Sequence, residues 1–424
     1  MTSETQDRPL EPRDASHEMR LVLWMSLANI LSLLGLQAFP SLLPGFIDLW
    51  QLTNTQAGWL NGIYFFGYML AVPLLLPLTD VVDARTVYLW ASAISFFSLA
   101  GFVLYADGFW SALLFRTFQG VGYAGCYMPG LKVLTDRSMA DNPSRGIALY
   151  TSSYLLAGSL SIYLSGELGR MYGWQFPFWG VALGAAGAFL IVWLATAYQQ
   201  PPPRNVGTHL LDFRPVFRQR TSLGYMVGYA MHNWELMGSI SWTVTFLTAA
   251  LAWQAPGQGD WNVTAVAALL TLSSFPASVI GNELAIRFGR RNTAVAVMLV
   301  SGIIGVASGF SVLLPFQVIL LLRVLYGITT TGESAIVTAG AIMSVPPYMR
   351  GSAMAVHSAA GFLGASLGPL GFGIALDLFG GRQTMLAWGM AHVVSSLGVV
   401  LGAMVVWWLV AGKQYERPDS SRRS

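Results

Sequence analysis

Two arginines lie inside apolar segments, and each is followed four residues later by a glycine. Arg116 precedes Gly120 in Arg-Thr-Phe-Gln-Gly, and Arg323 precedes Gly327 in Arg-Val-Leu-Tyr-Gly. A charge inside a bilayer-spanning helix costs about 2.5–3.5 kcal/mol on insertion scales, so it normally has a function. The two motifs are 207 residues apart in a chain of 424. This spacing indicates that the second half of the chain is an internal repeat of the first.

Three further ionisable residues inside apolar segments are candidates for the site. His232 and Glu235 are three residues apart and share a helix face. Glu235 falls near the middle of its segment, where a desolvated carboxyl group can load and release a proton at physiological pH. His232 could relay that proton, or be a satisfied interior group. Glu333, ten residues after Arg323 and on a different face of the helix, is a second candidate acid.

The arginines are candidates for anion binding. Arg116 keeps its proton and offers five donors suited to a carboxylate or another oxyanion. The alternatives are a structural partner to backbone carbonyls or to a glutamate of another helix, or a charge that tunes a proton path. Polar and aromatic residues able to line a cavity around these charges are Asn29, Gln37, Asn61, Tyr64, Tyr123, Tyr154, Trp234 and Trp242. We expect most of the tryptophans and tyrosines to serve in packing or at the lipid interface.

Composition places these residues in a membrane protein. Hydrophobic residues make up 54% of the chain and charged residues 10%, against about 25% charged in soluble domains. Gly120-Val-Gly122-Tyr-Ala-Gly125 spells a dinucleotide fingerprint, but it lies mid-membrane with no strand before it, so the glycines should serve helix contact. The chain has neither a P-loop nor a zinc motif, and its single cysteine, Cys126, permits no internal disulfide. We expect no enzyme activity, cofactor, metal or nucleic-acid site.

Apolar runs long enough to cross a bilayer recur along the chain. We predict an all-α integral membrane protein with twelve transmembrane helices, arranged as two six-helix halves related by a pseudo-two-fold axis. The expected spans are 21–42, 55–79, 84–105, 109–133, 146–168, 175–197, 221–250, 262–286, 291–311, 315–342, 352–376 and 384–410. The corresponding domains are an N-terminal tail (1–20), an N-terminal half (21–198), a linker (199–220), a C-terminal half (221–411) and a C-terminal tail (412–424).

The basic residues predict the orientation. If both termini are cytoplasmic, 19 of the 23 lysines and arginines fall on that side, as expected for cytoplasmic loops. We expect the N-terminal residues 1–20 to be a polar tail rather than a signal peptide. The arginine-rich, lysine-poor tails and the lack of long outer loops favour a multi-pass protein of a bacterial inner (plasma) membrane, which we expect to be monomeric.

Further landmarks repeat at nearly the same offset. Arg145-Gly146 is echoed by Arg350-Gly351, 205 residues later. Asp80-Val-Val-Asp83-Ala-Arg85 follows the second span, and a loop ending in Gly289-Arg290-Arg291 follows the eighth. Asp83 and Gly289 are 206 residues apart. Agreement among independent landmarks indicates an internal duplication, a known plan for transporters.

These motifs resemble those of the major facilitator superfamily over nearly the whole chain. That family's fourth-span signature, Arg-x-x-Gln-Gly-x-Gly, is matched by Arg116, Gln119, Gly120 and Gly122. Its loop signature between the second and third spans, Gly-x-Leu-x-Asp-Arg-x-Gly-Arg-Arg/Lys, is matched in part by each copy. The residues kept are Leu78, Asp80 and Arg85 in the first copy, and Leu284, Arg287, Gly289, Arg290 and Arg291 in the second.

The resemblance implies a cytoplasmic gate. In the family, an acid such as Asp80 faces the N-terminus of the eleventh span, here near Gly351, where the helix dipole favours negative charge. The gate would comprise Asp80, Arg85, Arg287, Gly289, Arg290 and Arg291; the alternative is that these arginines are only topology signals. The family's antiporter signature, a Gly-Pro motif in the fifth span, is missing from Ala157-Gly158-Ser159. This departure favours symport or uniport.

Together these features predict a secondary active transporter that works by alternating access. The solute should be a small organic or inorganic anion, moved with protons, and the substrate or proton pathway should comprise Arg116, Gln119, Tyr123, His232, Glu235, Trp242, Arg323 and Glu333. The partners implied are the solute, protons and the lipid bilayer. Two alternatives remain: proton-driven efflux of an amphipathic or cationic compound, and a receptor with a transporter fold that moves nothing.

Overall fold

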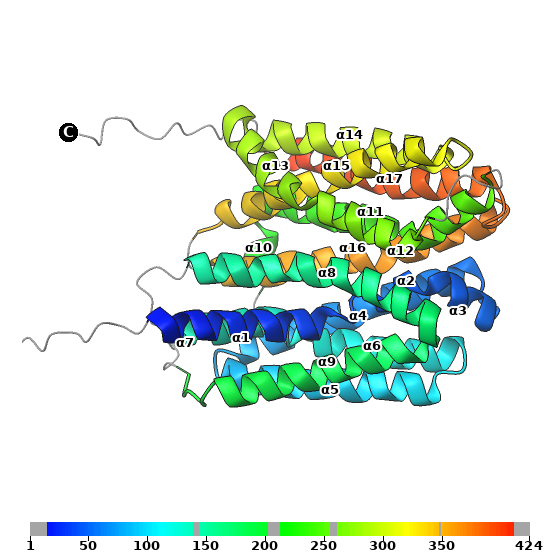
Figure 1. Cartoon of the computed structure of the whole chain (residues 1–424). Helices are drawn as coiled ribbons and strands as arrows, with labels where there is room; N and C mark the ends of the chain where they lie inside the picture. Colours follow the sequence, from blue (N-terminus) through cyan, green and yellow to red (C-terminus); the bar gives the residue numbers. More distant parts are fainter. Residues whose placement is uncertain (1–14, 139–143, 202–212, 255–260, 347–348, 411–424) are drawn as a thin grey trace, which may run out of the picture.

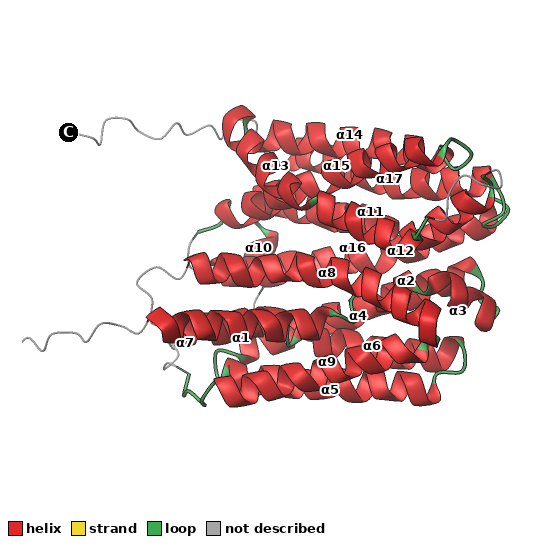
Figure 2. Cartoon of the chain, in the orientation of Figure 1, coloured by secondary structure: helices red, strands yellow, loops and turns green. Residues whose placement is uncertain are grey.

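The structure is a computed structural model that describes residues 15–138, 144–201, 213–254, 261–346 and 349–410. All regular secondary structure in these ranges is helical, as Figure 2 shows. The all-α prediction is therefore confirmed for them. Most of the predicted N-terminal tail (1–14), the centre of the predicted linker (202–212) and the predicted C-terminal tail lie outside the described residues.

The helices fall into two consecutive groups, which Figure 1 shows as two layers. The N-terminal half contains α1 (Ala15–Leu33), α2 (Ala38–Ser41), α3 (Leu43–Leu49), α4 (Asn54–Leu78), α5 (Ala84–Tyr105), α6 (Phe109–Ala124), α7 (Tyr127–Arg137), α8 (Ser144–Tyr172) and α9 (Gln175–Ala195). The C-terminal half contains α10 (Arg214–Phe217), α11 (Arg220–Ala252), α12 (Val263–Ser273), α13 (Phe275–Phe288), α14 (Arg290–Phe310), α15 (Phe316–Met343), α16 (Arg350–Leu378) and α17 (Met385–Leu409).

Ten segments within the described residues are long and apolar enough to cross a membrane as a helix, counting α12 and α13 as one. The first and fourth predicted spans are not single helices. The first breaks between α1 and α2, around Gly35, with Pro40 just beyond. The fourth breaks at Gly125 and Cys126, between α6 and α7. Membrane helices tolerate such breaks where neighbouring helices or water satisfy the freed backbone groups.

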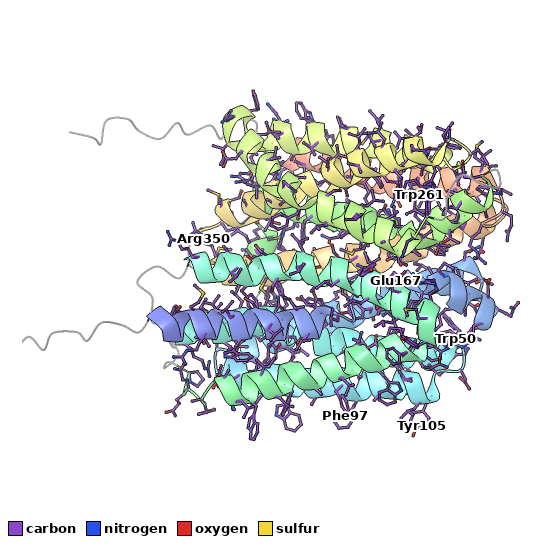
Figure 3. The ribbon with its side chains drawn as sticks, in the orientation of Figure 1. Trp50, Phe97, Tyr105, Glu167, Trp261 and Arg350 are labelled. Carbon is purple, nitrogen blue, oxygen red and sulfur yellow. The ribbon has the colours of Figure 1, made fainter. Side chains whose placement is uncertain are left out.

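The two ends of the bundle differ in charge. The arginine-rich end is where α1, α8 and α11 begin and α17 ends; it carries Arg85 and Arg291 at the starts of α5 and α14. The opposite end carries α2 and α3, at the right of Figure 1. Figure 3 places Arg350 at the arginine-rich end and Glu167 at the opposite end.

Small residues let helices approach within each half. A Cβ on Gly120 of α6 would lie 1.8 Å from the carbonyl oxygen of Tyr64 in α4. In the C-terminal half, a Cβ on Gly364 of α16 would lie 1.8 Å from the carbonyl oxygen of Ala230 in α11. Neither position accepts a side chain without moving a helix. The glycine run in the fourth span is thus a packing surface, as predicted from its context.

Contacts between the halves are concentrated toward the opposite end. There α2 and α3 pack against α11, and α12 packs against α8. The segments that continue these spans toward the arginine-rich end, α1 and α13, pack chiefly within their own half. The long helices α4 and α16 pack against each other across the halves. On the outer surface, Phe97 and Tyr105 of α5 point away from the bundle (Figure 3), and both are 70% exposed, as suits a lipid-facing helix.

Candidate functional site

Arg116 is buried in the N-terminal half and is held by uncharged groups. Its Nε donates to the carbonyl oxygen of Leu60 at 3.0 Å, and its Nη1 to Oε1 of Gln119 at 3.3 Å. The guanidinium carbon lies 4.7 Å from the ring centre of Phe39 and 5.0 Å from that of Tyr64. Cation–π contacts of this kind strengthen when they are shielded from water. Arg116 is thus bound to a carbonyl, one of the alternatives left by its sequence.

Arg323 occupies the corresponding place in the C-terminal half. It donates to Oγ1 of Thr243 and lies 3.2 Å from Nε2 of His392. Its guanidinium carbon is 5.5 Å from the ring centre of Phe246 and 5.6 Å from that of Tyr326. Its distance in sequence from Glu333 suggested that the two do not pair, and these contacts agree.

The surroundings of the two arginines repeat at a fixed offset. Arg116 and Arg323 are 207 residues apart, as are their ring partners Phe39 and Phe246. In both halves the arginine lies against an aromatic ring from the first helical span of that half. Among the described residues, neither arginine forms an ion pair with a carboxylate. Both guanidinium charges are therefore buried without a carboxylate partner.

Glu333 pairs with a histidine. Its Oε1 lies 2.8 Å from Nδ1 of His232, and both side chains are almost completely buried. Oε2 of Glu333 is buried without a hydrogen-bond partner among the described residues. A ring contact continues the cluster toward the arginine-rich end, because Tyr229 stacks between His232 and His357, with ring centres 5.8 and 3.9 Å away.

Glu235 is held by hydroxyl groups. Ser301 donates to its Oε2 at 2.9 Å, and the Tyr326 hydroxyl donates to its Oε1 at 3.2 Å. Thr330 lies 3.0 Å from the Ser301 hydroxyl and extends the network. Glu235 is completely buried. His232 and Glu235 therefore lie on one stretch of α11, as their spacing predicted, but they contact different partners.

These groups form a column along the C-terminal half. From the arginine-rich end toward the opposite end, its titratable members are His357, His232 with Glu333, Glu235 with Tyr326, and Arg323 with His392. Thr338 marks the first end, 3.2 Å from Nε2 of His357. Arg323 and Thr338 are both in α15, and 15 residues of helix span about 22 Å.

A small cavity borders the column. Its volume is about 50 Å³, and it lies between α11, the α12–α13 bend and α15. Most of its polar lining is hydroxyl, from residues such as Ser239, Thr271 and Ser274, together with the guanidinium-bearing side chain of Arg323. A pocket lined by hydroxyl groups and one cation is suited to a small anionic group.

A different chemistry lines the N-terminal half. Tyr123 stacks on Tyr64, with ring centres 5.6 Å apart, and contacts the tilted ring of Tyr68 at 5.0 Å. Asn61 is 1% exposed, and neither polar atom of its side chain has a partner among the described residues. Nε2 of Gln119 likewise has none. Buried amide atoms without partners cost free energy unless water or a ligand bonds to them.

The predicted lining tryptophans serve in packing. Trp242 donates to the carbonyl oxygen of Pro369 at 3.1 Å and stacks on Phe372, which ties α11 to α16. Trp234 donates to the carbonyl oxygen of Val394 at 3.2 Å, which ties α11 to α17. Of the remaining predicted lining residues, Asn29 donates to Ser153 at 2.7 Å, Gln37 is buried and Tyr154 is half-buried.

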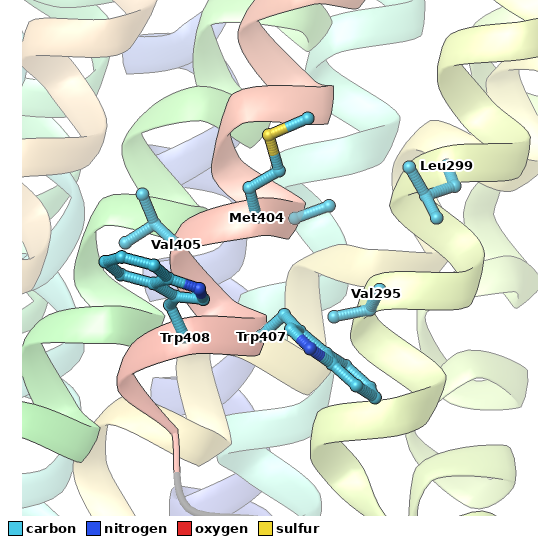
Figure 4. Close-up of a pocket in the computed structure, with 7 residues that line it drawn as sticks. Val295, Leu299, Met404, Val405, Trp407 and Trp408 are labelled. Atoms are coloured by element: carbon cyan, nitrogen blue, oxygen red, sulfur yellow. The ribbon is translucent and has the colours of Figure 1, made fainter.

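A larger groove of about 630 Å³ lies away from all these charges. Figure 4 shows it between α14 and α17, with Met404, Trp407 and Trp408 opposite Val295 and Leu299. Trp408 is 86% exposed there. The groove is apolar and lies on the outer surface of the bundle, so it is a lipid-facing feature and unsuited to a polar solute.

Comparison with known proteins decides the family. The family model described as Major Facilitator Superfamily matches residues 25–258 and 236–424. The chain belongs to the major facilitator superfamily. It is accordingly a secondary transporter and not an enzyme. This confirms the resemblance found in its motifs.

Similar members of the superfamily are distant. An uncharacterized MFS-type transporter of Bacillus subtilis, YceJ, is 23% identical over 80% of this chain and 85% of its own length. Bovine protein spinster homolog 1 is 22% identical over 57% of this chain and 46% of its own length. Among solved structures, a bacterial homologue of the human lysosomal transporter Spinster, in an inward-facing and unoccupied conformation, has a TM-score of 0.73 at 17% identity, covering 94% of this chain and 98% of that one.

The nucleoside transporter NupG is also similar in structure. It has a TM-score of 0.73 at 14% identity and covers 94% of this chain and 100% of its own. At these identities the likeness shows a shared fold. The substrates of such superfamily members differ, so the substrate must be argued from this transporter's own residues.

The predicted gate residues of the transporter do not form one cluster. Asp80 is exposed, and its side chain has no hydrogen-bond partner among the described residues; a Cβ on Gly351, its expected neighbour, would meet nothing within 4 Å. Arg290 donates to Asn282 at 3.1 Å within its own half, and Arg287 is exposed.

Arg85 and Arg291 instead form a repeated clamp. Arg85 donates to the carbonyl oxygen of Trp193 at 2.9 Å, and Arg291 to that of Trp407 at 2.8 Å. Each bond joins the start of the third span to the end of the sixth span of one half. Only Arg291 also stacks on its tryptophan among the described residues, 3.9 Å from the ring centre.

Asp83 is the partnered carboxylate of this loop, which sequence reasoning missed in favour of Asp80. It accepts two hydrogen bonds from Nη2 of Arg137, at 2.7 and 3.0 Å, and further ones from the backbone nitrogens of Gln199 and Arg85. Burial opposes ionisation of Asp83, but these hydrogen bonds together hold its pKa below its usual value. In the second copy, Gly289 occupies this place with a φ of +88°.

Other functional candidates were also missed. Ser301, Thr243, Tyr326 and His392 contact the predicted charges directly but come from other helices or lack a charge. The offset of 207 residues is a signal that would have found Tyr326, because Gln119 precedes it by that offset.

Proposed function

We propose that this transporter carries a small organic anion together with protons, by symport. The observation that carries the proposal is the separation of buried charges. Glu235 and Glu333 contact hydroxyl groups and a histidine, and the buried arginines contact carbonyls, hydroxyls, rings and a histidine. Acid–histidine chains inside membrane helices mark proton pathways, and unpaired buried cations suit anionic ligands.

Arg323 is the better of the two candidates for the anion. It borders the hydroxyl-lined cavity, whereas Arg116 is enclosed by a backbone carbonyl, Gln119 and two rings. The unpartnered amides of Asn61 and Gln119 offer donors and acceptors to an uncharged part of the solute. The presence of these amide groups favours an organic anion over an inorganic one.

In this mechanism, Glu235 and the His232–Glu333 pair bind the coupling proton. Protonation neutralises a charge in the column, and the loaded column then changes conformation with the solute. The transporter lies in the bacterial inner membrane as a monomer, with both termini cytoplasmic. The distribution of 19 of its 23 basic residues on one side supports this orientation.

Ligand-induced stabilisation is the direct test. A bound ligand raises the free energy of unfolding by RT ln(1 + [L]/Kd). We expect mono- or dicarboxylates to raise the melting temperature of the purified transporter, and Arg323→Gln to abolish the rise. Arg382→Gln, which changes an arginine outside the spans, is the matched control.

Binding must then be compared with transport of the same compound across a membrane. Reconstituted transporter should accumulate the stabilising carboxylate when the pH is lower on the side of addition. Stabilisation by cations or amphipathic compounds alone, with loss on Glu235→Gln, would replace the proposal with proton-driven efflux. Binding without accumulation would indicate a receptor.

A further inference from the structure

Asp377 joins the two halves of the transporter at the opposite end. It lies in the last turn of α16 and contacts the first turn of α4. Its Oδ1 accepts from the backbone nitrogen of Asn54 at 3.1 Å and from the side-chain Nδ2 of Asn54 at 2.7 Å. Its Oδ2 accepts from the backbone nitrogen and the hydroxyl of Thr55, both at 2.7 Å.

This contact is a helix cap supplied by the other half of the molecule. The first backbone N–H groups of a helix have no partner within it, and the helix dipole favours a negative charge beside them. Thr53 already caps the nitrogen of Gln56, so Asp377 satisfies two further donors of the same turn. Hydrogen bonds to an ionised carboxylate are about twice as strong as neutral ones.

Next to Asp377, the backbones of α4 and α16 are in direct contact. A Cβ on Gly62 of α4 would lie 2.0 Å from the carbonyl oxygen of Ser366, and one on Gly58 would lie 2.5 Å from that of Pro369. A Cβ on Gly373 of α16 would lie 2.2 Å from the carbonyl oxygen of Asn54. Further along, Phe362 of α16 stacks on Phe65 and Tyr68 of α4, with ring centres 6.3 and 3.6 Å apart.

The other end of this helix pair is arranged in mirror fashion but is not joined. α4 and α16 run antiparallel, so each presents an aspartate at its end to the beginning of the other. Asp80 lies two residues after the end of α4 and would face the first turn of α16, yet it is exposed and its side chain has no polar partner among the described residues. Gly351, in that turn, has open space around it.

We propose that Asp377 is a positioning residue for transport, a latch that holds the transporter closed at the opposite end. Asp80 caps α16 when the transporter closes at the arginine-rich end, so that one aspartate is engaged at a time. The Asp80 contact is the one implied by the family resemblance; the Asp377 contact comes from this structure. The inference requires alternating access only, and depends on neither the proposed anion nor the proton.

Distances between spin labels in lipid nanodiscs test the latch without a substrate. Cys126→Ser removes the single cysteine, whose Sγ lies 3.6 Å from the Ser92 hydroxyl. Labels on Gly108→Cys and Leu313→Cys report on the opposite end, one in each half. Labels on Leu149→Cys and Phe288→Cys report on the arginine-rich end.

Asp377→Ala should raise the population with long distances at the opposite end by about tenfold, which equals the loss of one net charged hydrogen bond. Distances at the arginine-rich end should shorten in the same sample. Asp48→Ala is the matched control: Asp48 also bridges the halves at this end, to Arg382 at 3.7 Å, but its side chain is 80% exposed. Exposed pairs contribute little, so distances should change less than about twofold in population.

Unchanged distance distributions in Asp377→Ala would overturn the proposal. If that variant does not fold, Asp377→Asn and Thr55→Val, singly and combined, provide the test. Both should favour opening at the opposite end, and the double variant should add less than the sum of the two. Additive effects would show that Asp377 acts through something other than the first turn of α4.

Discussion

The two halves of this transporter share a framework but differ in their buried chemistry. Both place an arginine of the fourth span of the half against an aromatic ring, and both clamp a third span to a sixth through an arginine. Only the C-terminal half adds buried glutamates and histidines within the described spans. The N-terminal half carries stacked tyrosines and unpartnered amides in their place.

This difference indicates that the two halves kept the contacts that join their helices, whereas their buried titratable groups diverged. Contacts present in both halves use backbone carbonyls, which any sequence supplies, or an aromatic ring at the repeated position. The acid–histidine column requires five helices, α11, α14, α15, α16 and α17, to present matched side chains. We therefore expect substitutions in the shared framework to affect stability, and substitutions in the column to affect coupling.

The largest effect should come from Glu235→Gln, which tests whether the column carries the proton. Proton-driven accumulation should fall by about 100-fold, because general acid–base groups contribute at this scale, while exchange of solute across the membrane continues. Uptake and counterflow in proteoliposomes measure the two. Glu283→Gln, an exposed glutamate of the same half, should leave both unchanged. Full coupling in Glu235→Gln would remove the functional contrast between the halves.

The next largest effects should distinguish the two buried arginines, because substitution of each should change a different property. Arg323→Gln should raise the KM for the solute by about tenfold or more, the scale of one charged hydrogen bond, with little change in the melting temperature. Arg116→Gln should mainly lower stability, by about 2–4 kcal/mol, since it leaves the Leu60 carbonyl and two rings without their cation. Transport kinetics beside thermal unfolding distinguish them. The reverse pattern would assign the anion to the N-terminal half.

The ionised Asp83 gives the N-terminal half a pH-dependent contact. The C-terminal half lacks this contact because Gly289, at the corresponding position, has no side chain. A folded-state pKa below the usual value contributes stability above about pH 4, the unfolded value, and that stability is lost as pH falls through the folded value. Asp83→Asn should lower stability at pH 7 by about 1–3 kcal/mol and much less at the acid end of the range. Thermal unfolding between pH 3 and 7 measures this. An equal loss throughout would mean that charge is irrelevant there.

The smallest effect should distinguish the two clamps. Arg291→Lys should destabilise the transporter by about 0.5–1 kcal/mol more than Arg85→Lys, because Arg291 alone of the two stacks on its tryptophan. Thermal unfolding in nanodiscs compares the two variants directly. Equal losses would show that the hydrogen bond to the carbonyl accounts for both clamps.

Sequence patterns predicted the helical membrane fold, the duplication and which charges are buried. Hydropathy and fixed offsets are properties of single segments, so they can be read without a structure. The partners of the charges could not be predicted. Glu333 meets His232 across 101 residues, and Asp377 meets Asn54 across 323. Such pairs depend on how separate helices rotate and slide against one another.

The breaks in the first and fourth spans were missed for a related reason. Membrane helices often contain glycine and proline without breaking, because neighbouring groups satisfy the backbone. Gly35 and Gly125 therefore did not distinguish themselves from Gly120 and Gly122, which remain helical. Trp234 and Trp242 use their indole nitrogens to join helices, which agrees with the expectation that most tryptophans serve in packing.

The length of the column has an electrical consequence. It covers about 22 Å of a hydrocarbon core that is about 30 Å thick. In the proposed symport, a proton that moves between Arg323–His392 and His357 crosses most of the voltage drop across the membrane. At about 2.3 kcal/mol per charge per 100 mV for the whole drop, this step depends on voltage by roughly 1.5–2 kcal/mol per 100 mV. A carboxylate that crosses with the proton cancels this contribution, so uptake at equal pH responds to membrane potential only when the protons moved per cycle outnumber the negative charges of the solute.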